Sequence, residues 1–118
     1  MVFLRIDPAS PVPLFEQLSA AVRADIGRGE LVPGDRLPSA RELAESLDIN
    51  LHTVLRAYQQ LRDEGLIDLR RGRGAVVTAR AADYAGISLA IPQLVTEAKR
   101  LGLSASALTA LIREEYNA

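Results

Sequence analysis

Apolar residues recur at spacings of three and four along the first 65 residues, a pattern that predicts helices. The first helix carries one apolar stripe, formed by Phe15, Leu18, Val22 and Ile26. It is expected to start with Pro13 at the first helical position, where a proline sacrifices no backbone hydrogen bond. Glycines mark its end near Gly27 or Gly29. The segment therefore predicts an amphipathic helix with one buried face.

Two shorter helices follow, joined by a tight turn. Ser39 and Glu42 form an S-x-x-E capping box, so the second helix is predicted to begin there. Its core residues are Leu43, Ala44 and Leu47, and the pattern breaks at residues 48–50. Asn50 is the expected N-cap of a third helix that runs to about Glu64.

The third helix has an apolar side and a polar side. At 100° per residue, the apolar side is formed by Val54, Ala57, Tyr58 and Leu61. The opposite side is formed by His52, Arg56, Gln59 and Asp63. We expect the first set in the core and the second in solvent.

Short strands are predicted on both sides of the two central helices. Residues 35–38 indicate a brief strand after the Pro33-Gly34 turn. After Gly65, the alternating runs 66–70 and 75–78 are joined by Arg-Gly-Arg-Gly, which predicts a hairpin with a basic tip.

The last part of the chain, residues 81–118, is richer in apolar residues, with 21 of 38. One helix is expected to stop at Gly102, and Pro92 either starts it or kinks a longer helix reaching back toward Tyr84. Ser104 is the expected N-cap of a last helix. Two short helices cannot bury so many apolar side chains against each other, so a homodimer is expected. The expected dimerisation residues are Leu94, Val95, Leu101, Leu108, Leu111 and Ile112.

The predicted fold class is α+β and mostly helical. Two short helices joined by three or four residues and followed by a basic hairpin are typical of a winged helix-turn-helix. The expected domains are a winged helix over residues 1–80 and a two-helix dimerisation extension over residues 81–118. This layout favours binding to double-stranded DNA, because a helix fits the major groove and its N-terminal side chains reach the bases.

The layout assigns roles to several residues. His52 and Arg56 are expected to face the bases, with Asn50 and Thr53 near the helix entrance and Leu51 able to touch a thymine methyl. The backbone amides at Ser39 can hold a phosphate at a helix N-terminus. Arginines on a glycine-built turn can follow the DNA backbone or enter the minor groove.

The amino-acid composition excludes several other classes of functional site. The chain has no Cys and a single His, which excludes a disulfide framework, a thiolate nucleophile and a Cys-rich zinc site. His52 lies in the helix expected to face DNA and no oxyanion loop accompanies it, so no catalytic triad is available and no enzyme is expected. A metal site at His52 would need further ligands, and only carboxylates remain, so no metal site or cofactor is expected. Apolar runs long enough for a membrane span or a leader are missing, so a cytoplasmic protein without membrane contact is expected.

The distribution of charge matters more than its sum. The formal net charge of −1 does not by itself indicate a nucleic-acid partner. Residues 70–80, however, carry no acid and four basic groups, Arg70, Arg71, Arg73 and Arg80. The positive charge therefore gathers at the predicted hairpin.

Several sequence blocks resemble the DNA-binding domain of GntR-family bacterial transcription regulators. They are Leu37-Pro-Ser-Ala-Arg-Glu-Leu-Ala44, Thr53-Val, Arg56-Ala-Tyr58, Glu64-Gly-Leu-Ile67 and Arg70-Arg-Gly-Arg-Gly74. The blocks span roughly residues 10–78 in the family's order and spacing. The short tail resembles the YtrA-like subfamily, which implies a homodimeric repressor often associated with transporter operons.

The resemblance implies site residues by position. Arg41 matches a residue that family members aim at DNA, residues 50–53 match the start of the recognition helix, and Arg71, Gly72 and Arg73 match the wing tip. Two departures stand out: Asp48 replaces a usual turn glycine, and Leu51-His52 replaces the Pro-Asn of relatives with this tail. The sequence leaves open whether a small-molecule effector binds.

Alternatives remain for single residues and for the whole chain. Arg41 can instead pair with Glu45 at i, i+4, and His52 can be an idle solvated side chain. The winged helix can dock a protein instead of DNA, which a weak salt dependence of binding would reveal. A regulatory domain cut from a larger enzyme fusion is a further alternative, although its linker should be polar and residues 81–118 are apolar.

Overall fold

The computed structural model describes residues 6–70 and 74–118. The described chain divides into two compact units, and the boundary lies between Ala85 and Gly86. The sequence placed the boundary at residue 80. The 3-10 helix Ala79–Tyr84 explains this difference, because it buries Ala81 in the core of the first unit.

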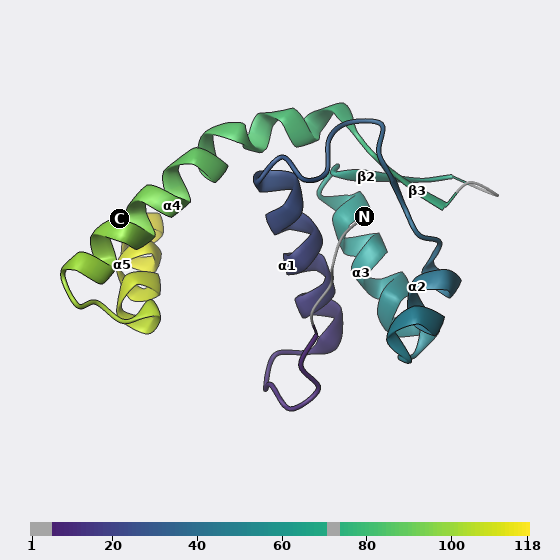
Figure 1. The fold of residues 1–118 in the computed structure, drawn as a ribbon, viewed down its shortest axis with the longest axis horizontal. Helices are drawn as coiled ribbons and strands as arrows, with labels where there is room; N and C mark the ends of the chain where they lie inside the picture. The colour runs from purple at the N-terminus through teal and green to yellow at the C-terminus, as the bar shows by residue number, and fades with distance from the viewer. Residues whose placement is uncertain (1–5, 71–73) are drawn as a thin grey trace. The chain divides into compact units, whose positions relative to one another are not determined.

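The first unit is a winged helix, drawn in purple to teal in Figure 1. Its helices are α1 (Leu14–Gly27), α2 (Ala40–Leu47) and α3 (Leu51–Asp63), and its strands are β1 (Arg36–Leu37), β2 (Ile67–Arg70) and β3 (Gly74–Val77). The fold class predicted from the sequence is confirmed. One boundary prediction was wrong: Pro13 is the N-cap residue of α1, and its carbonyl accepts the first helical hydrogen bonds from Glu16 and Gln17.

The three strands form one antiparallel sheet in the order β1-β3-β2. Arg36 pairs with Val76 and Leu37 with Ala75, so the two-residue strand before α2 is tied to the hairpin. Ile67 pairs with Val77 across the other edge of β3. One face of the sheet buries Leu37, Ala75, Val77 and Ile67 in the core, as alternation of side chains in strands requires.

The core of the first unit lies between the three helices and this sheet. The predicted apolar side of α3 is confirmed, because Val54, Ala57, Tyr58 and Leu61 are all at most 2% exposed. In α1, Leu18, Val22 and Ile26 are buried, whereas Phe15 at the start of the stripe is only half-buried. This difference leaves part of the Phe15 ring available for another contact.

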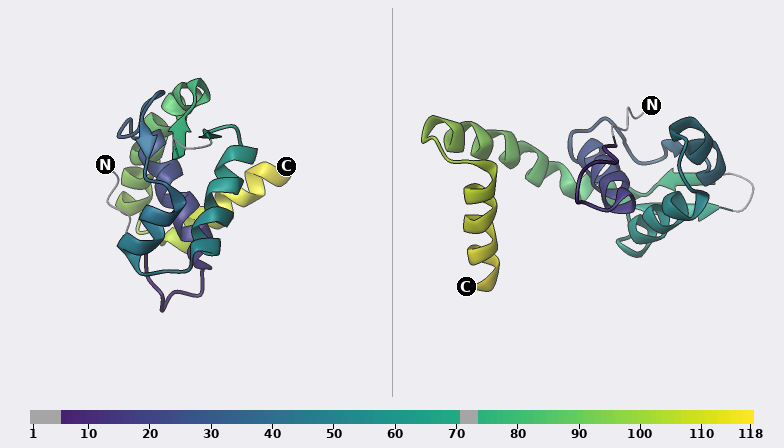
Figure 2. Two further views of the ribbon diagram at one scale, coloured as in Figure 1. Left: turned by 90° about the vertical axis from the view of Figure 1, so that its right-hand side faces the viewer. Right: turned by 90° about the horizontal axis from the view of Figure 1, so that it is seen from below.

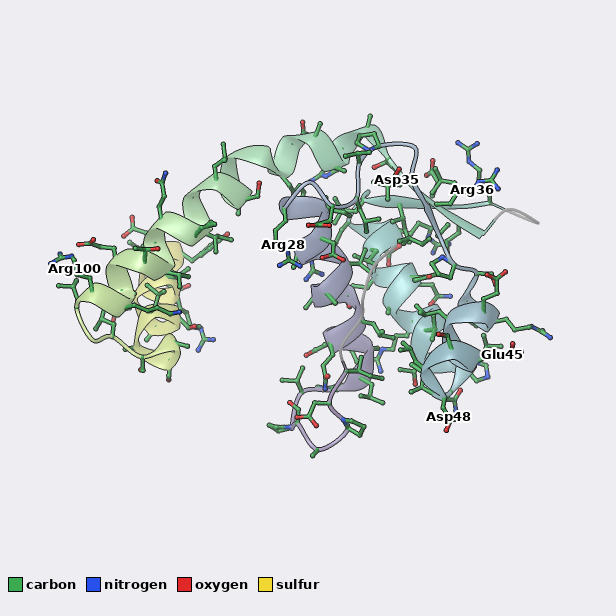
Figure 3. The ribbon with its side chains drawn as sticks, viewed as in Figure 1. Arg28, Asp35, Arg36, Glu45, Asp48 and Arg100 are labelled. Atoms are coloured by element: carbon green, nitrogen blue, oxygen red, sulfur yellow. The ribbon has the colours of Figure 1, made fainter. Side chains whose placement is uncertain are left out.

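Helix α4 spans Ala85–Arg100. Helices α1, α2, α3 and α4 all end in the same hydrogen-bond pattern, in which a residue with positive φ allows two backbone amides to donate to carbonyl groups of the last turn. Gly29, Gly65 and Gly102 occupy this position in α1, α3 and α4. In α2 it is held by Asp48, with φ of 54°. Figure 3 labels Asp48 at the turn between α2 and α3.

We expect Asp48→Gly to raise the free energy of unfolding by about 0.5–1 kcal/mol. Glycine adopts positive φ freely, whereas an L-residue there costs roughly 1–2 kcal/mol, and the larger entropy of unfolded glycine offsets part of the gain. Urea unfolding followed by circular dichroism measures the change. Asp48→Ala is the matched control and should lower stability, and a loss of stability in Asp48→Gly would contradict the argument.

The second unit consists of most of α4 and of α5 (Ala105–Asn117), the green and yellow helices in Figures 1 and 2. Pro92 lies inside α4, so the longer helix reaching back toward Tyr84 is the alternative that the structure confirms. Ser104 caps α5 as predicted, since its hydroxyl accepts a hydrogen bond from the Ala107 amide at 3.1 Å. No helix within the described residues is long and apolar enough to cross a membrane.

Candidate nucleic-acid interface

Helices α2 and α3 form a helix-turn-helix whose second helix has a solvent-facing polar side. The turn is closed by the Ile49 amide, which donates to the Ala44 carbonyl at 3.0 Å. His52, Arg56, Gln59 and Asp63 are all exposed, as the helical periodicity predicts. The polar side of α3 is therefore available to a partner.

The N-terminus of α2 carries the backbone amide groups of the first turn and an exposed arginine. The Ser39 hydroxyl accepts a hydrogen bond from the Glu42 amide at 3.2 Å, which confirms the predicted cap, and Ser39 is half-buried. Arg41 is exposed and, among residues 6–70 and 74–118, forms no ion pair with Glu45 or any other acid. The i, i+4 pair with Glu45 is therefore not formed in the described part of the chain.

Some residues at the start of α3 stabilise the helix or pack against the core, whereas another is exposed to solvent. The Asn50 side-chain oxygen accepts a hydrogen bond from the His52 amide at 2.8 Å, so it caps α3 as predicted. Leu51 is half-buried and packs against the core, and Thr53 is also half-buried. His52 is thus the exposed side chain of the first turn.

Tyr58 links α3 to the segment that leads into α2. Its hydroxyl donates to the carbonyl oxygen of Pro38 at 2.6 Å, directly before the cap residue Ser39. Burial, with a smaller contribution from the Glu42 carboxylate, raises the pKa of Tyr58 well above its ordinary value of 10.0. The neutral phenol therefore fixes the entry to α2 relative to α3.

We expect stability to fall above about pH 10, by up to about 1.4 kcal/mol per pH unit from Tyr58. Above that pH the unfolded phenol loses its proton while the folded one keeps it, so the unfolded state binds fewer protons. The contribution is fully present below pH 10 and is lost as the pH rises through the raised pKa. Tyr58→Phe should cost about 1 kcal/mol at pH 8 and show a shallower alkaline decline. Urea unfolding at pH 8 to 11 tests this, and equal slopes in both proteins would contradict it.

Three side-chain contacts, one helical turn apart on each helix, join α1 to α3, which lie side by side in Figure 1. The guanidinium carbon of Arg56 lies 3.8 Å from the ring centroid of Phe15. The Ser19 hydroxyl hydrogen-bonds with the side-chain amide of Gln60 at 3.0 Å. We call these contacts, together with the next one, the α1–α3 ladder.

The third contact of the ladder is a bidentate ion pair. Arg23 donates from Nε and from a terminal nitrogen to the two carboxylate oxygens of Glu64, at 2.9 and 2.8 Å. The hydrogen bonds that Arg23 donates to the Glu64 carboxylate raise the pKa of Arg23. The ladder fixes α3 along its length against α1, so the exposed side of α3 has a defined orientation in the first unit.

The first rung of the ladder borders an open groove of about 670 Å³ between the first turns of α1 and α3. Its lining includes Phe15, Glu16, Asn50, His52, Thr53 and Arg56. Four of these were predicted site residues from the sequence, and the structure brings them together on one surface. Phe15 and Glu16 come from α1 and were not predicted there. The four-residue spacing that Phe15, Ser19 and Arg23 share with Arg56, Gln60 and Glu64 is the signal that could have indicated them.

The strands of the predicted wing are confirmed, while its predicted tip residues Arg71, Gly72 and Arg73 lie outside the described residues. The base of the wing packs close to the start of α2. A Cβ atom on Gly74 would lie 3.6 Å from Cα of Ser39 and 3.5 Å from the Leu37 carbonyl oxygen. Arg36, labelled in Figure 3, is exposed on β1 and was not singled out from the sequence.

The predicted dimerisation residues lie on α4, on α5 and in the turn between them. Leu94, Val95, Leu101, Leu111 and Ile112 are exposed, and Leu108 is half-buried. Among the side chains that the structure describes in the second unit, only Ala98 is buried. Most of the apolar surface of this unit is therefore uncovered in the single chain.

No group of three or more metal-binding side chains occurs in the described parts of the chain. The exposed polar side of α3, the N-terminus of α2 and the strands of the wing all belong to the first unit. A helix of this kind matches the width of the DNA major groove.

Comparisons with known proteins agree with this geometry. Residues 14–77 match the family model of bacterial regulatory proteins of the gntR family. The chain is 34% identical to the HTH-type transcriptional repressor YtrA of Bacillus subtilis (strain 168), an alignment that covers 94% of this chain and 90% of that protein.

Two solved structures are also similar. YtrA from Sulfolobus acidocaldarius, a GntR-family transcription factor, has a TM-score of 0.60 and 39% identity over 75% of this chain and 97% of that one. The AraR DNA-binding domain in complex with operator ORX1 has a TM-score of 0.56 and 26% identity over 64% of this chain and 93% of that one. The second similarity covers a domain that was solved on DNA.

Proposed function

The chain belongs to the GntR family of bacterial regulatory proteins and is a DNA-binding transcription regulator, and from this premise we propose that it acts as a homodimeric repressor on a short inverted-repeat operator. The observation that carries the proposal is that α3 exposes a polar side to solvent, while the rest of the helix packs against α1 and α2. We propose that it acts in the cytoplasm. The repressor assignment is supported by the name of the Bacillus subtilis relative.

The proposed interface has three parts. His52 and Arg56, with Asn50, Thr53 and the exposed part of Leu51, face the bases in the major groove. The amide end of α2 at Ser39, with Arg41, holds the DNA backbone, since helix N-termini bind phosphate. The wing tip at Arg71, Gly72 and Arg73 adds backbone or minor-groove contacts.

In the proposed dimer, the second unit joins two chains, so that the protein can bind two operator half-sites. Exposed side chains such as Leu101 and Leu111, at 59% and 53%, form more apolar surface than an isolated monomer normally shows. A second copy carries the same apolar surface, and a two-fold axis pairs such surfaces with themselves. Two recognition helices then bind two half-sites related by symmetry.

Selection from a pool of random duplexes tests the proposal with the full chain. We expect enrichment of an inverted repeat whose half-site centres lie about one helical turn, or a multiple of it, apart. Affinity for the selected duplex should fall steeply with salt, because phosphate contacts release counterions. Recovery of no sequence preference, or binding that is insensitive to salt, would contradict operator recognition and favour a protein partner for the winged helix.

A further inference from the structure

The first rung of the α1–α3 ladder differs in chemistry from the other two. Ser19 with Gln60 and Arg23 with Glu64 are polar pairs joined by hydrogen bonds between their side chains. In the first rung, the guanidinium of Arg56 lies over the face of the Phe15 ring. The ring attracts the cation through its π-electrons and takes up none of its hydrogen bonds.

Phe15 is itself fixed by the fold. The ring is half-buried and packs against the hydrophobic core, whereas Arg56 is exposed. A free arginine in solvent samples many rotamers and loses this freedom when it binds. Stacking on a fixed ring restrains the guanidinium before any partner arrives, which lowers the entropy lost on binding.

The hydrogen-bond donors of Arg56 stay available in the stacked arrangement. The guanidinium is planar and its five N–H groups point outward in that plane, so a stacked arginine can still donate two parallel hydrogen bonds to O6 and N7 of guanine. In the described chain, Arg56 forms no ion pair, although Glu16 lines the same groove. His52 lines this groove from the preceding turn of α3.

We propose that Phe15 is a positioning residue for base recognition, and that its ring fixes the Arg56 guanidinium for a guanine contact in each half-site. Phe15 belongs to α1, outside the helix-turn-helix, and need not touch DNA to act in this way. The inference rests on the proposed function, that the exposed side of α3 reads the operator.

The test compares Phe15→Leu with Phe15→Tyr in the full chain, by competition titration against every single-base variant of the selected operator. Phe15→Leu removes the ring and should lose about 5- to 30-fold of discrimination over two half-sites, at the same base pair as Arg56→Ala. Phe15→Tyr keeps the ring and should retain the discrimination. In an Arg56→Ala background, Phe15→Leu should cause no further loss at that base pair.

Ser19→Ala is the matched control, because it removes the next rung without touching Arg56. It should weaken all duplexes similarly, if it changes binding at all. Circular dichroism checks folding, and Phe15→Met, which keeps the bulk but not the ring, replaces Phe15→Leu if that variant unfolds.

Each remaining outcome overturns the inference. Uniform weakening by Phe15→Leu, loss at a different base pair, failure of Phe15→Tyr to retain discrimination, or no effect of Arg56→Ala on base preference would each do so. If the wild-type chain selects no operator, the proposed function itself fails. If it selects one that Phe15→Leu reads equally well, only the positioning role fails.

Discussion

His52→Ala is expected to remove the preference for one base pair in each half-site while leaving the affinity for unrelated duplexes almost unchanged. His52 is the exposed side chain of the first turn of α3, and its backbone amide is already capped by Asn50. Truncation should therefore leave the helix intact. Removing one base-reading side chain costs on the order of 1–3 kcal/mol, and the cost is felt twice in a symmetric operator.

The measurement is a competition titration against all single-base variants of the selected operator. Arg73→Ala gives the contrasting pattern, since a wing arginine on the DNA backbone should strengthen binding to every duplex by a similar factor. Its removal should therefore weaken all duplexes alike and lower the salt slope by about one for each phosphate that the arginine neutralises. Changing Leu51-His52 to Pro-Asn should shift preference toward the site of relatives with that sequence. Uniform weakening by His52→Ala would show that this histidine does not read sequence.

Removing the second unit is expected to give a folded monomer that binds the operator about 100- to 10,000-fold more weakly, because only one half-site is then held at a time. The chain should be cut after Ala85, since the preceding 3-10 helix contributes Ala81 to the core and Tyr84 packs against it. Sedimentation reports the mass and a binding titration reports the affinity.

A full-length control keeps the tail but changes its surface. Leu101→Glu with Leu111→Glu places charges at two exposed apolar positions and should dissociate the dimer without unfolding the first unit. A wild-type chain that is monomeric at tens of micromolar (roughly the range in which weak dimers form) would contradict the proposed dimer, as would operator affinity unchanged by the truncation.

Local patterns in the sequence were enough to predict the α-helices and several of their ends. Ser39, Asn50 and Ser104 cap their helices as predicted, because a cap depends on residues within one turn. The polar and apolar sides of α3 also follow from its own periodicity. Pro92 left two alternatives open, since both a helix start and a kinked interior accept a proline under some conditions.

Features that depend on distant residues were missed. The pairing of β1 with β3 joins Arg36 to Val76, and two residues carry too little pattern to indicate a partner strand. Each rung of the α1–α3 ladder joins residues 41 positions apart, so no local rule connects Phe15 with Arg56. The sequence placed Arg56 correctly in solvent but not on an aromatic ring. The predicted roles of individual site residues stay predictions.

If the apolar surface of α4 and α5 joins two chains as proposed, it also determines how repression responds to the amount of protein. When most chains are monomeric, the amount of dimer rises as the square of the chain concentration, so a roughly tenfold rise in chain gives a roughly hundredfold rise in dimer. Operator occupancy by a dimer then changes steeply over a narrow range of expression. Substitutions at exposed tail residues such as Leu94 or Ile112 would shift that range without altering which operator is recognised.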